Sequence, residues 1–155
     1  MTAKISEKHL RRQRARRRAL QAVYQWQMTG HETKKIISQF NAEQNMSNVD
    51  QELFAFLLRS VVNEHADLDK KLQPFMDRPI EQLDETERAI LRIAATELLF
   101  SLEVPVKVVL NEAIDLAHRF GAEQSHAYIN GVLDKAATDW RSVEITATTA
   151  QKLKS

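Results

Sequence analysis

Residues 11–28 read RRQRARRRALQAVYQWQM, and the order of their apolar and charged side chains predicts the first structural element. At 100° per residue, one face of a helix would carry Ala15, Ala19, Ala22, Val23 and Trp26. The opposite face would carry Arg14, Arg17, Arg18, Gln21 and Gln25, while Arg12 and Arg16 flank the apolar stripe. The stretch therefore predicts an amphipathic helix from about Lys8 to Met28, ended by Gly30.

Helical patterns continue along the rest of the chain. They cover residues 33–43, a stretch from Asp50 that is interrupted near residues 63–64, and residues 84–102, 105–120 and 123–141. Asp84 with Glu87 three residues later is typical of a helix start, Pro105 suits the first position of a helix, and Gly121 suits a helix end. No strand pattern competes. We predict an all-α fold of six or seven short helices in two small packed bundles.

Composition shifts predict how the chain is divided. Pro79 and the polar residues after it interrupt the helical pattern. We expect a disordered N-terminus over residues 1–9, an N-terminal helical subdomain over 10–80 and a C-terminal subdomain over 81–141. Residues 142–155, rich in Thr, Ala and Lys, are expected to form a mobile tail.

Composition also excludes several classes of protein. The chain has no cysteine, which removes disulfides, thiolate catalysis and cysteine-based zinc sites. No apolar run approaches the roughly 20 residues that span a bilayer, and a secretory signal pattern is interrupted by Gln21, Gln25 and Gln27. A soluble cytoplasmic protein that does not associate with membranes is therefore expected.

Catalytic chemistry finds no support in the pattern of residues. The five histidines lack metal-ligand spacing, and no glycine-rich phosphate loop follows a strand. Acidic residues around Asp84 are explained by the positive end of the helix that begins there. We therefore expect no enzyme activity, no catalytic residues, no metal and no cofactor.

Charge is distributed unevenly between the N-terminus and the body. The first 30 residues carry eight Lys and Arg against one acid, so the net charge of +1 for the whole chain leaves −6 for the remainder. Six arginines without an interposed acid repel one another, which disfavours a merely solvated face. Guanidinium groups bridge phosphates and stack on bases, so nucleic-acid binding is the favoured interpretation.

RNA is favoured over duplex DNA because the basic helix comes first and an acidic helical body follows it. A membrane-surface helix is less favoured, since the apolar face is largely alanine. Tyr24 and Tyr128 could stack on unpaired bases, but either could equally lie at the edge of the core.

Several blocks of sequence carry a resemblance to a known family. Residues 14–16, 19–27 (ALQAVYQWQ), 87–94 (ERAILRIA), 104–107, 111–114, 120–123, 125–126 and 129–135 (INGVLDK) resemble the NusB family of bacterial transcription antitermination factors. The resemblance implies binding to boxA, a short single-stranded element of nascent ribosomal RNA. It also implies a partner, the small-subunit ribosomal protein NusE, and assembly with RNA polymerase and the other Nus factors.

The resemblance further implies functional residues. Arg12, Arg14 and Arg16 look like RNA-facing arginines, with Arg17 as an added phosphate contact. A second RNA contact is implied for residues 124–128, comprising Gln124, Ser125, Ala127 and Tyr128. Tyr24 and Glu87 resemble residues that contact NusE. Gln13 and Gln124 depart from the family pattern, and Arg17 and Arg18 extend the arginine run beyond it.

Two other functions compete with this interpretation. A NusB-like domain also begins certain ribosomal RNA cytosine methyltransferases, but these 155 residues contain neither a cofactor-binding α/β pattern nor a cysteine. The chain could instead be a structural module whose basic helix docks on an acidic partner. Competition by single-stranded RNA would separate that function from RNA binding.

Overall fold

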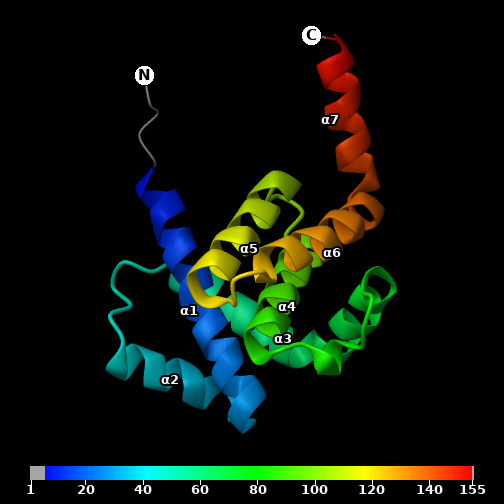
Figure 1. Cartoon of the computed structure of the whole chain (residues 1–155). Coiled ribbons are helices and arrows are strands. Elements are labelled where there is room, and N and C mark those ends of the chain that lie inside the picture. The colour runs from blue at the N-terminus through cyan, green and yellow to red at the C-terminus, as the bar shows by residue number, and fades with distance from the viewer. Residues whose placement is uncertain (1–5, 155) are drawn as a thin grey trace.

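The computed structural model describes residues 6–154, with side chains through residue 151, and over that range it contains helices and no strands (Figure 1). Its α-helices are α1 (Glu7–Thr29), α2 (Thr33–Glu43), α3 (Gln51–Leu72), α4 (Glu85–Phe100), α5 (Val106–Phe120), α6 (Ser125–Trp140) and α7 (Ser142–Lys154). Two 3-10 turns, η1 (Gln73–Phe75) and η2 (Ile80–Gln82), lie between α3 and α4. The prediction of an all-α fold is confirmed.

Helix α1 begins and ends at recognisable caps. The Ser6 hydroxyl accepts a hydrogen bond from the His9 amide, and Gly30 ends the helix with a φ of 71°, in the left-handed region that glycine tolerates. The start at Glu7 means that the prediction of disorder over residues 1–9 is wrong for residues 7–9. Residues 1–5 lie outside the described part of the chain.

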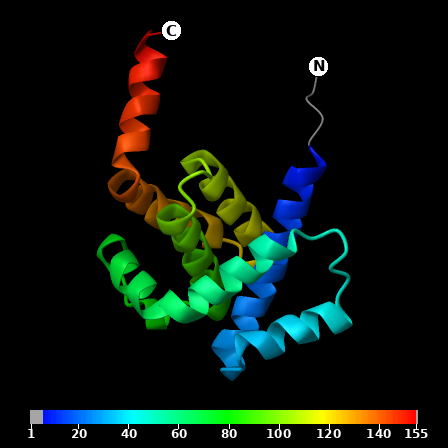
Figure 2. The ribbon, with the colours of Figure 1, turned by 180° about the vertical axis from the view of Figure 1, so that it is seen from behind.

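Helix α4 is the centre of the molecule. Its residues 89–98 are all buried, because α1, α3, α5 and α6 surround it. α3 packs on one side of the α1–α4 pair, with α2 beside it, and α5 and α6 pack on the other side (Figure 2). Buried residues from before and after residue 80 form one continuous core. The division into two subdomains at that point therefore remains a prediction.

Helix α3 is longer than the sequence pattern predicts. The expected interruption near residues 63–64 is absent, and α3 runs unbroken to Leu72. Its start is as expected, with the Asp50 carboxylate accepting a hydrogen bond from the Leu53 amide at 3.0 Å. The helix continues because Leu68 and Leu72 extend the buried stripe, while the polar residues at 63–64 face solvent without breaking the backbone hydrogen bonds.

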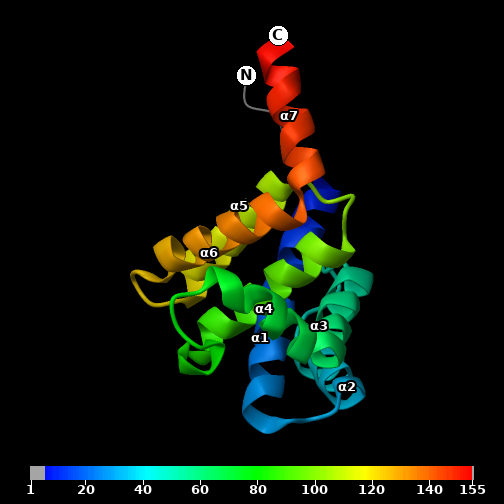
Figure 3. The ribbon, with the colours of Figure 1, turned by 90° about the vertical axis from the view of Figure 1, so that its right-hand side faces the viewer.

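The C-terminal residues are helical, although the sequence predicts a mobile tail over 142–155. Helix α7 stands away from the rest of the fold and contacts mainly α6 (Figure 3). Its base is fixed by Arg141, which is 4% exposed and donates hydrogen bonds to four backbone carbonyls at and after the end of α4, those of Glu97, Leu98, Ser101 and Val104. Glu144 accepts from Arg141 and from the first amide of α5. The sequence analysis did not predict this helix, and the mobility of the tail stays a prediction.

A buried ion pair joins α1 to α4. Arg16 and Glu97 are each 2% exposed in their side chains, and the two guanidinium–carboxylate hydrogen bonds measure 2.7 and 2.9 Å. Burial disfavours the charged form of Arg16, but the hydrogen bond and the charge of Glu97 together raise its pKa. The geometry is bidentate, which makes α1 unable to rotate about its axis without breaking both bonds.

We expect Arg16→Met to lower the free energy of unfolding by about 3–5 kcal/mol, because it leaves the Glu97 carboxylate buried without a partner. The double variant Arg16→Met/Glu97→Leu should be more stable than Arg16→Met alone, since it removes both charges. Urea denaturation, monitored by circular dichroism, measures the free energy of unfolding of the unmodified protein and of both variants. Arg59→Met, at an exposed position on α3, is the matched control and should change stability by less than about 0.5 kcal/mol. A loss below about 1 kcal/mol in Arg16→Met would contradict the assignment.

Candidate nucleic-acid interface

The arginines of α1 separate into two groups according to the helical period. Arg14, Arg17 and Arg18 share one side of the helix, whereas Arg12 and Arg16 lie on another. Of the five residues predicted to share a polar face, Arg14, Arg17, Arg18 and Gln21 line one pocket, whereas Gln25 donates to Gln39 of α2. The three arginines expected to act together on RNA, Arg12, Arg14 and Arg16, are not brought together.

Arg16 is unavailable to RNA. Its guanidinium lies in the core and is held by Glu97, so the prediction that it faces RNA is wrong. Gln13, one of the departures from the family pattern, also points inward and donates to the Glu112 carboxylate of α5 at 3.0 Å. Arg12 lies in a groove that Asp50, Glu52 and Glu103 also line, and its nearest acid is Asp50 at 3.7 Å. These acids reduce the attraction of Arg12 for an anion.

The other arginines line a surface pocket of about 330 Å³, which we call the arginine pocket. Three elements form its walls: α1, the α2–α3 connector and the end of α5. Its lining residues are Arg14, Arg17, Arg18, Gln21, Asn45, Asn48, Val49 and Phe120. The pocket thus combines guanidinium groups, side-chain amides and one aromatic ring, and no acidic residue lines it.

The arginines of this pocket are held in place by contacts that leave most of their charge unneutralised. Arg14 donates to the Asn48 carbonyl at 3.2 Å and lies 3.5 Å from an exposed Glu7 carboxylate. Arg17 approaches Asp115 of α5 at 3.8 Å, and Arg18 contacts Gln21 at 3.4 Å. Long, solvent-exposed ion pairs of this kind contribute little energy, so they compete weakly with a phosphate.

The second predicted RNA contact, residues 124–128, begins α6 four residues after Phe120. Gln124 and Ala127 are exposed, as an RNA contact requires. Ser125 is 4% exposed and its amide donates to the Ala122 carbonyl, so a direct contact from this residue is contradicted. Gly121 shapes the turn by close approach, because a Cβ there would lie 2.8 Å from the Ala117 carbonyl oxygen.

Tyr128 turns toward the start of α4. The Arg78 guanidinium lies 4.5 Å from the centre of its ring, a cation–π contact that covers one face of the ring. Burial and the charge of Asp77 raise the pKa of Tyr128, and the charge of Glu87 acts in the same direction. Tyr128 therefore lies near Glu87, a predicted partner contact, and has only part of its surface free for stacking on RNA.

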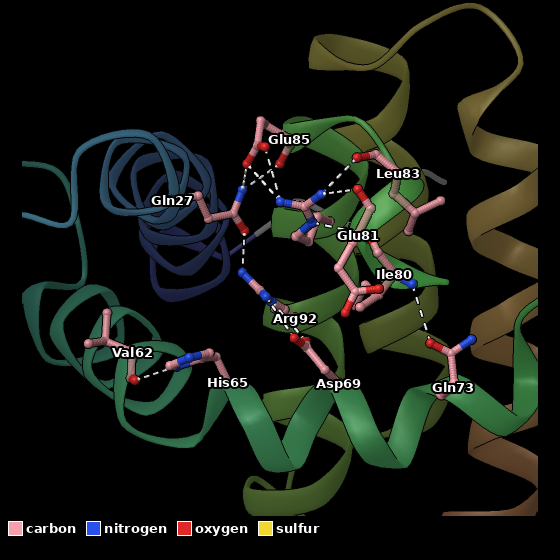
Figure 4. Close-up of polar contacts among 11 residues, drawn as sticks. Gln27, Val62, His65, Asp69, Gln73, Ile80, Glu81, Leu83, Glu85 and Arg92 are labelled. Carbon is pink, nitrogen blue, oxygen red and sulfur yellow. Dashed lines mark hydrogen bonds and ion pairs between the residues drawn. The ribbon is translucent and has the colours of Figure 1, made fainter. Parts of the chain in front are cut away.

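The two predicted partner contacts come from helices that a polar network holds together (Figure 4). Gln27 of α1 donates to the backbone and side chain of Glu85 at the start of α4, and Arg92 donates to Gln27 at 3.0 Å and to Asp69 of α3 at 2.7 and 2.9 Å. Tyr24, one turn before Gln27, is 42% exposed. The network fixes the C-terminal half of α1 against the first turn of α4, which carries Glu87.

Glu87 has an unusual protonation equilibrium. Burial raises its pKa to about 7, and the hydrogen bond and charge of Asp84 act in the same direction, while the charge of Arg78 opposes them. The helix start itself is as predicted, with the Asp84 carboxylate accepting from the Glu87 amide at 2.8 Å. Glu87 is therefore a carboxyl group that is only partly charged near neutral pH.

Sequence reasoning missed six of the eight residues that line the arginine pocket as candidates for binding, namely Arg18, Gln21, Asn45, Asn48, Val49 and Phe120. Arg18 and Gln21 had a detectable signal, since both lie on the polar face with Arg14. Asn48 and Phe120 had none, because they reach the pocket through contacts between segments far apart in the sequence.

Comparison with known proteins identifies the family. A sequence model described as the NusB family matches residues 13–138. The chain is 52% identical over 139 residues to the transcription antitermination protein NusB of Xanthomonas axonopodis pv. citri, covering 90% of this chain and 87% of that protein. The chain belongs to the NusB family. It is also 53% identical over 133 residues to the protein of that name from Xanthomonas oryzae pv. oryzae, covering 86% of this chain and 85% of the relative.

Solved structures of NusB proteins share the fold. T. maritima NusB matches with a TM-score of 0.71 at 23% identity, covering 88% of this chain and 93% of that chain. A structure of the antitermination factors NusB and NusE in complex with dsRNA matches with a TM-score of 0.74 at 24% identity, covering 82% of this chain and 96% of that chain. NusB family membership agrees with the prediction of a transcription factor rather than an enzyme.

The described residues contain neither a membrane-spanning helix nor a cluster of metal-binding side chains. Along the part of the chain that the structure describes, no helix is long and apolar enough to cross a membrane. Among the same residues, no group of three or more histidine or acidic side chains is arranged to hold a metal ion.

The pKa of Glu87 predicts a pH-dependent stability. An unfolded glutamate releases its proton near pH 4.5, whereas folded Glu87 retains it up to about pH 7, so this group stabilises the fold at low pH and the contribution is lost as pH rises through 7. Replacing Glu87 by Gln should make the free energy of unfolding fall less between pH 5 and pH 8 than it does in the unmodified protein.

Urea denaturation at several pH values measures this difference. Glu103→Gln, an exposed glutamate after the other end of α4, is the control and should follow the unmodified protein. Parallel pH profiles for the unmodified protein and Glu87→Gln would rule out a raised pKa at this position.

Proposed function

We propose that this protein is a transcription antitermination factor of the bacterial cytoplasm that binds boxA-like single-stranded RNA together with a NusE-like ribosomal protein. It would act in the RNA polymerase complex with other Nus factors. The observation that carries the RNA part of the proposal is the arginine pocket, where Arg14, Arg17 and Arg18 meet without an acid in the lining. The relatives that cover most of the chain are transcription antitermination proteins.

The RNA contacts that we propose are fewer than the sequence predicts. Arg14 and Arg17 remain, and Gln124 and Ala127 stay candidates because both are exposed at the start of α6. Arg12 contributes from the neighbouring groove, where Asp50 competes for its charge. Tyr128 contributes with the part of its ring that Arg78 leaves free. Arg16 acts on RNA binding only by fixing the orientation of α1.

Single-stranded RNA fits the pocket better than a duplex does. The NusB–NusE structure of similar fold holds double-stranded RNA. In this chain, however, an exposed aromatic ring and side-chain amides lie beside the arginines, and such groups recognise unpaired bases. A duplex hides its base faces by stacking and would use only the guanidinium groups.

The proposed partner surface comprises Tyr24 and Glu87. Tyr24 offers an exposed ring on α1, and Glu87 offers a carboxyl group that a basic residue of the partner would hold in its charged form. Because the chain outside residues 1–30 carries a net negative charge, it suits a basic ribosomal protein.

We expect Arg14→Ala to weaken binding of a boxA-like RNA and to reduce the slope of log affinity against log salt by about 0.7, because one phosphate contact is lost. Fluorescence anisotropy over a series of salt concentrations, with the NusE-like protein present, measures both quantities. Arg59→Ala, an exposed arginine on α3, should leave affinity and slope unchanged.

A duplex of the same sequence should compete poorly with the labelled single strand. Equal competition by duplex and single strand would refute the preference for unpaired RNA. If Arg14→Ala binds with the affinity and slope of the unmodified protein, the arginine pocket is not the RNA site.

We expect Glu87→Lys to weaken the complex with the NusE-like protein at least about 10-fold, because it places a like charge opposite a basic partner. Isothermal titration calorimetry measures the affinity, and circular dichroism checks that the helical content is kept. Glu103→Lys makes the same charge change after the far end of α4 and should have little effect. Unchanged affinity in Glu87→Lys would remove this residue from the interface.

A further inference from the structure

We propose that the arginine pocket holds one unpaired nucleotide of the bound RNA, with its base stacked on Phe120 and its phosphate on the guanidinium groups of α1. This inference rests on the proposed RNA-binding function and adds a specific subsite to it. The subsite would give the protein a base contact in addition to the electrostatic attraction that any polyanion feels.

The size and the composition of the pocket fit one nucleotide. Its volume of about 330 Å³ is at the lower end of the range for small-molecule sites, which matches a single nucleotide rather than several. A nucleotide has a flat base, which can stack on an aromatic ring, and a charged phosphate, which can bind guanidinium groups. One aromatic ring and three guanidinium groups face the same space.

Packing in the hydrophobic core does not explain why residue 120 is a phenylalanine. It is 42% exposed, lies at the last position of α5, and does not belong to the apolar side chains packed on the core. An aromatic residue left in solvent beside arginines is the arrangement that single-strand binders use for stacking. Phe120 is followed by a tight turn at Gly121. Any side chain at residue 121 would collide with the Ala117 carbonyl and with Ser125, so the turn requires glycine and holds Phe120 at the end of α5.

The polar groups of the pocket have hydrogen-bonding capacity left for a ligand. Asn48 is exposed, its carbonyl accepts from Arg14, and its side-chain amide makes no hydrogen bond with any described residue. A free amide of this kind pairs with the edge of a base. Arg17 contacts Asp115 only at 3.8 Å, so the terminal nitrogens of its guanidinium are weakly engaged.

Arg17 and Arg18 triple the number of guanidinium groups that Arg14 alone would give the pocket. Together with Arg14 they form its charged wall. We therefore expect Arg17 and Arg18 to bind the phosphate of one nucleotide in the pocket between α1, Asn48 and Phe120, and not only to raise the net positive charge of α1.

The experiment combines a protein substitution with a change in the RNA. A boxA-like RNA with several flanking nucleotides is prepared as an intact strand and as a set in which each nucleotide in turn is abasic. Affinities are measured by fluorescence anisotropy for the unmodified full chain, in the presence of the NusE-like protein, and for Phe120→Ala. Circular dichroism confirms that the variants keep the helical content.

In the unmodified protein, one abasic position should weaken binding by about 5-fold or more, because one base–aromatic stack is lost. Phe120→Ala should weaken binding of the intact RNA by a similar factor, and the same abasic position should then have no further effect. Phe120→Trp should keep both the affinity and the sensitivity to that position. Val143→Ala, at an exposed apolar position of α7, should behave as the unmodified protein.

Arg18→Ala separates the phosphate contact from the base contact. It should weaken every RNA of the set by the same factor and reduce the salt slope by about 0.7. Phe120→Ala should leave the salt slope unchanged.

The inference is overturned if Phe120→Ala binds the intact RNA as tightly as the unmodified protein, or if no abasic position loses its effect in that variant. A pocket that acts through charge alone would give this result, with Arg18→Ala still weakening binding. Such an outcome leaves the proposed function intact. Failure of the unmodified protein to bind the RNA at all would instead refute the proposed function itself.

Discussion

The buried ion pair between Arg16 and Glu97 constrains the rest of the structure. Two charges taken from water need a close, saturated geometry to be tolerated, and this pair meets the requirement with hydrogen bonds of 2.7 and 2.9 Å. Because the pair fixes the rotation of α1, the helical period then dictates which arginines face solvent. Arg14 lies two residues before Arg16 and Arg18 two residues after it, each about 200° around the helix, so both point away from the core. The binding surface is thus a geometric consequence of a core contact.

Glu97 also belongs to the segment where a second arginine acts. The Arg141 guanidinium binds the carbonyls of Glu97, Leu98, Ser101 and Val104. The Leu98 carbonyl is one of the acceptors that the last turn of a helix leaves without an intrahelical partner, whereas Glu97 and Ser101 also accept from backbone amides. Its charge also complements the negative end of the helix dipole. Helix α4 is therefore held at its last turns by Arg16 from α1 and by Arg141 from the end of α6. Arginines therefore serve two purposes in this protein. Arg16 and Arg141 have buried partners and stabilise the fold, whereas the arginines of the arginine pocket lie at the surface and are available to a ligand.

Features determined by neighbouring residues could be predicted from the sequence, and features determined by distant residues could not. The end of α1 at Gly30 and the start of α4 at Asp84 follow from local caps, and both were predicted. The burial of Arg16 depends on Glu97, 81 residues away, so nothing within the arginine run distinguishes Arg16 from its neighbours. Phe120 and Asn48 likewise reach the arginine pocket only through the packing of α5 and of the α2–α3 connector against α1. Helix α7 was missed because its composition lacks an apolar stripe, and its base is fixed from outside by Arg141.

Helix α1 carries both proposed contact surfaces, and this arrangement has a thermodynamic consequence. Arg14 and Arg17 lie in its first half, whereas Tyr24 lies in its second half, beside the network of Gln27, Glu85 and Arg92. Because the core already holds both halves of α1, the two ligands would contact one rigid helix. Linkage makes any effect between them mutual: if the partner raises the affinity for RNA by some factor, RNA raises the affinity for the partner by the same factor. The ion pair to Glu97 comes from Arg16, within the stretch that carries Arg14 and Arg17, so the RNA-binding half of α1 is anchored by the same residue that fixes its orientation.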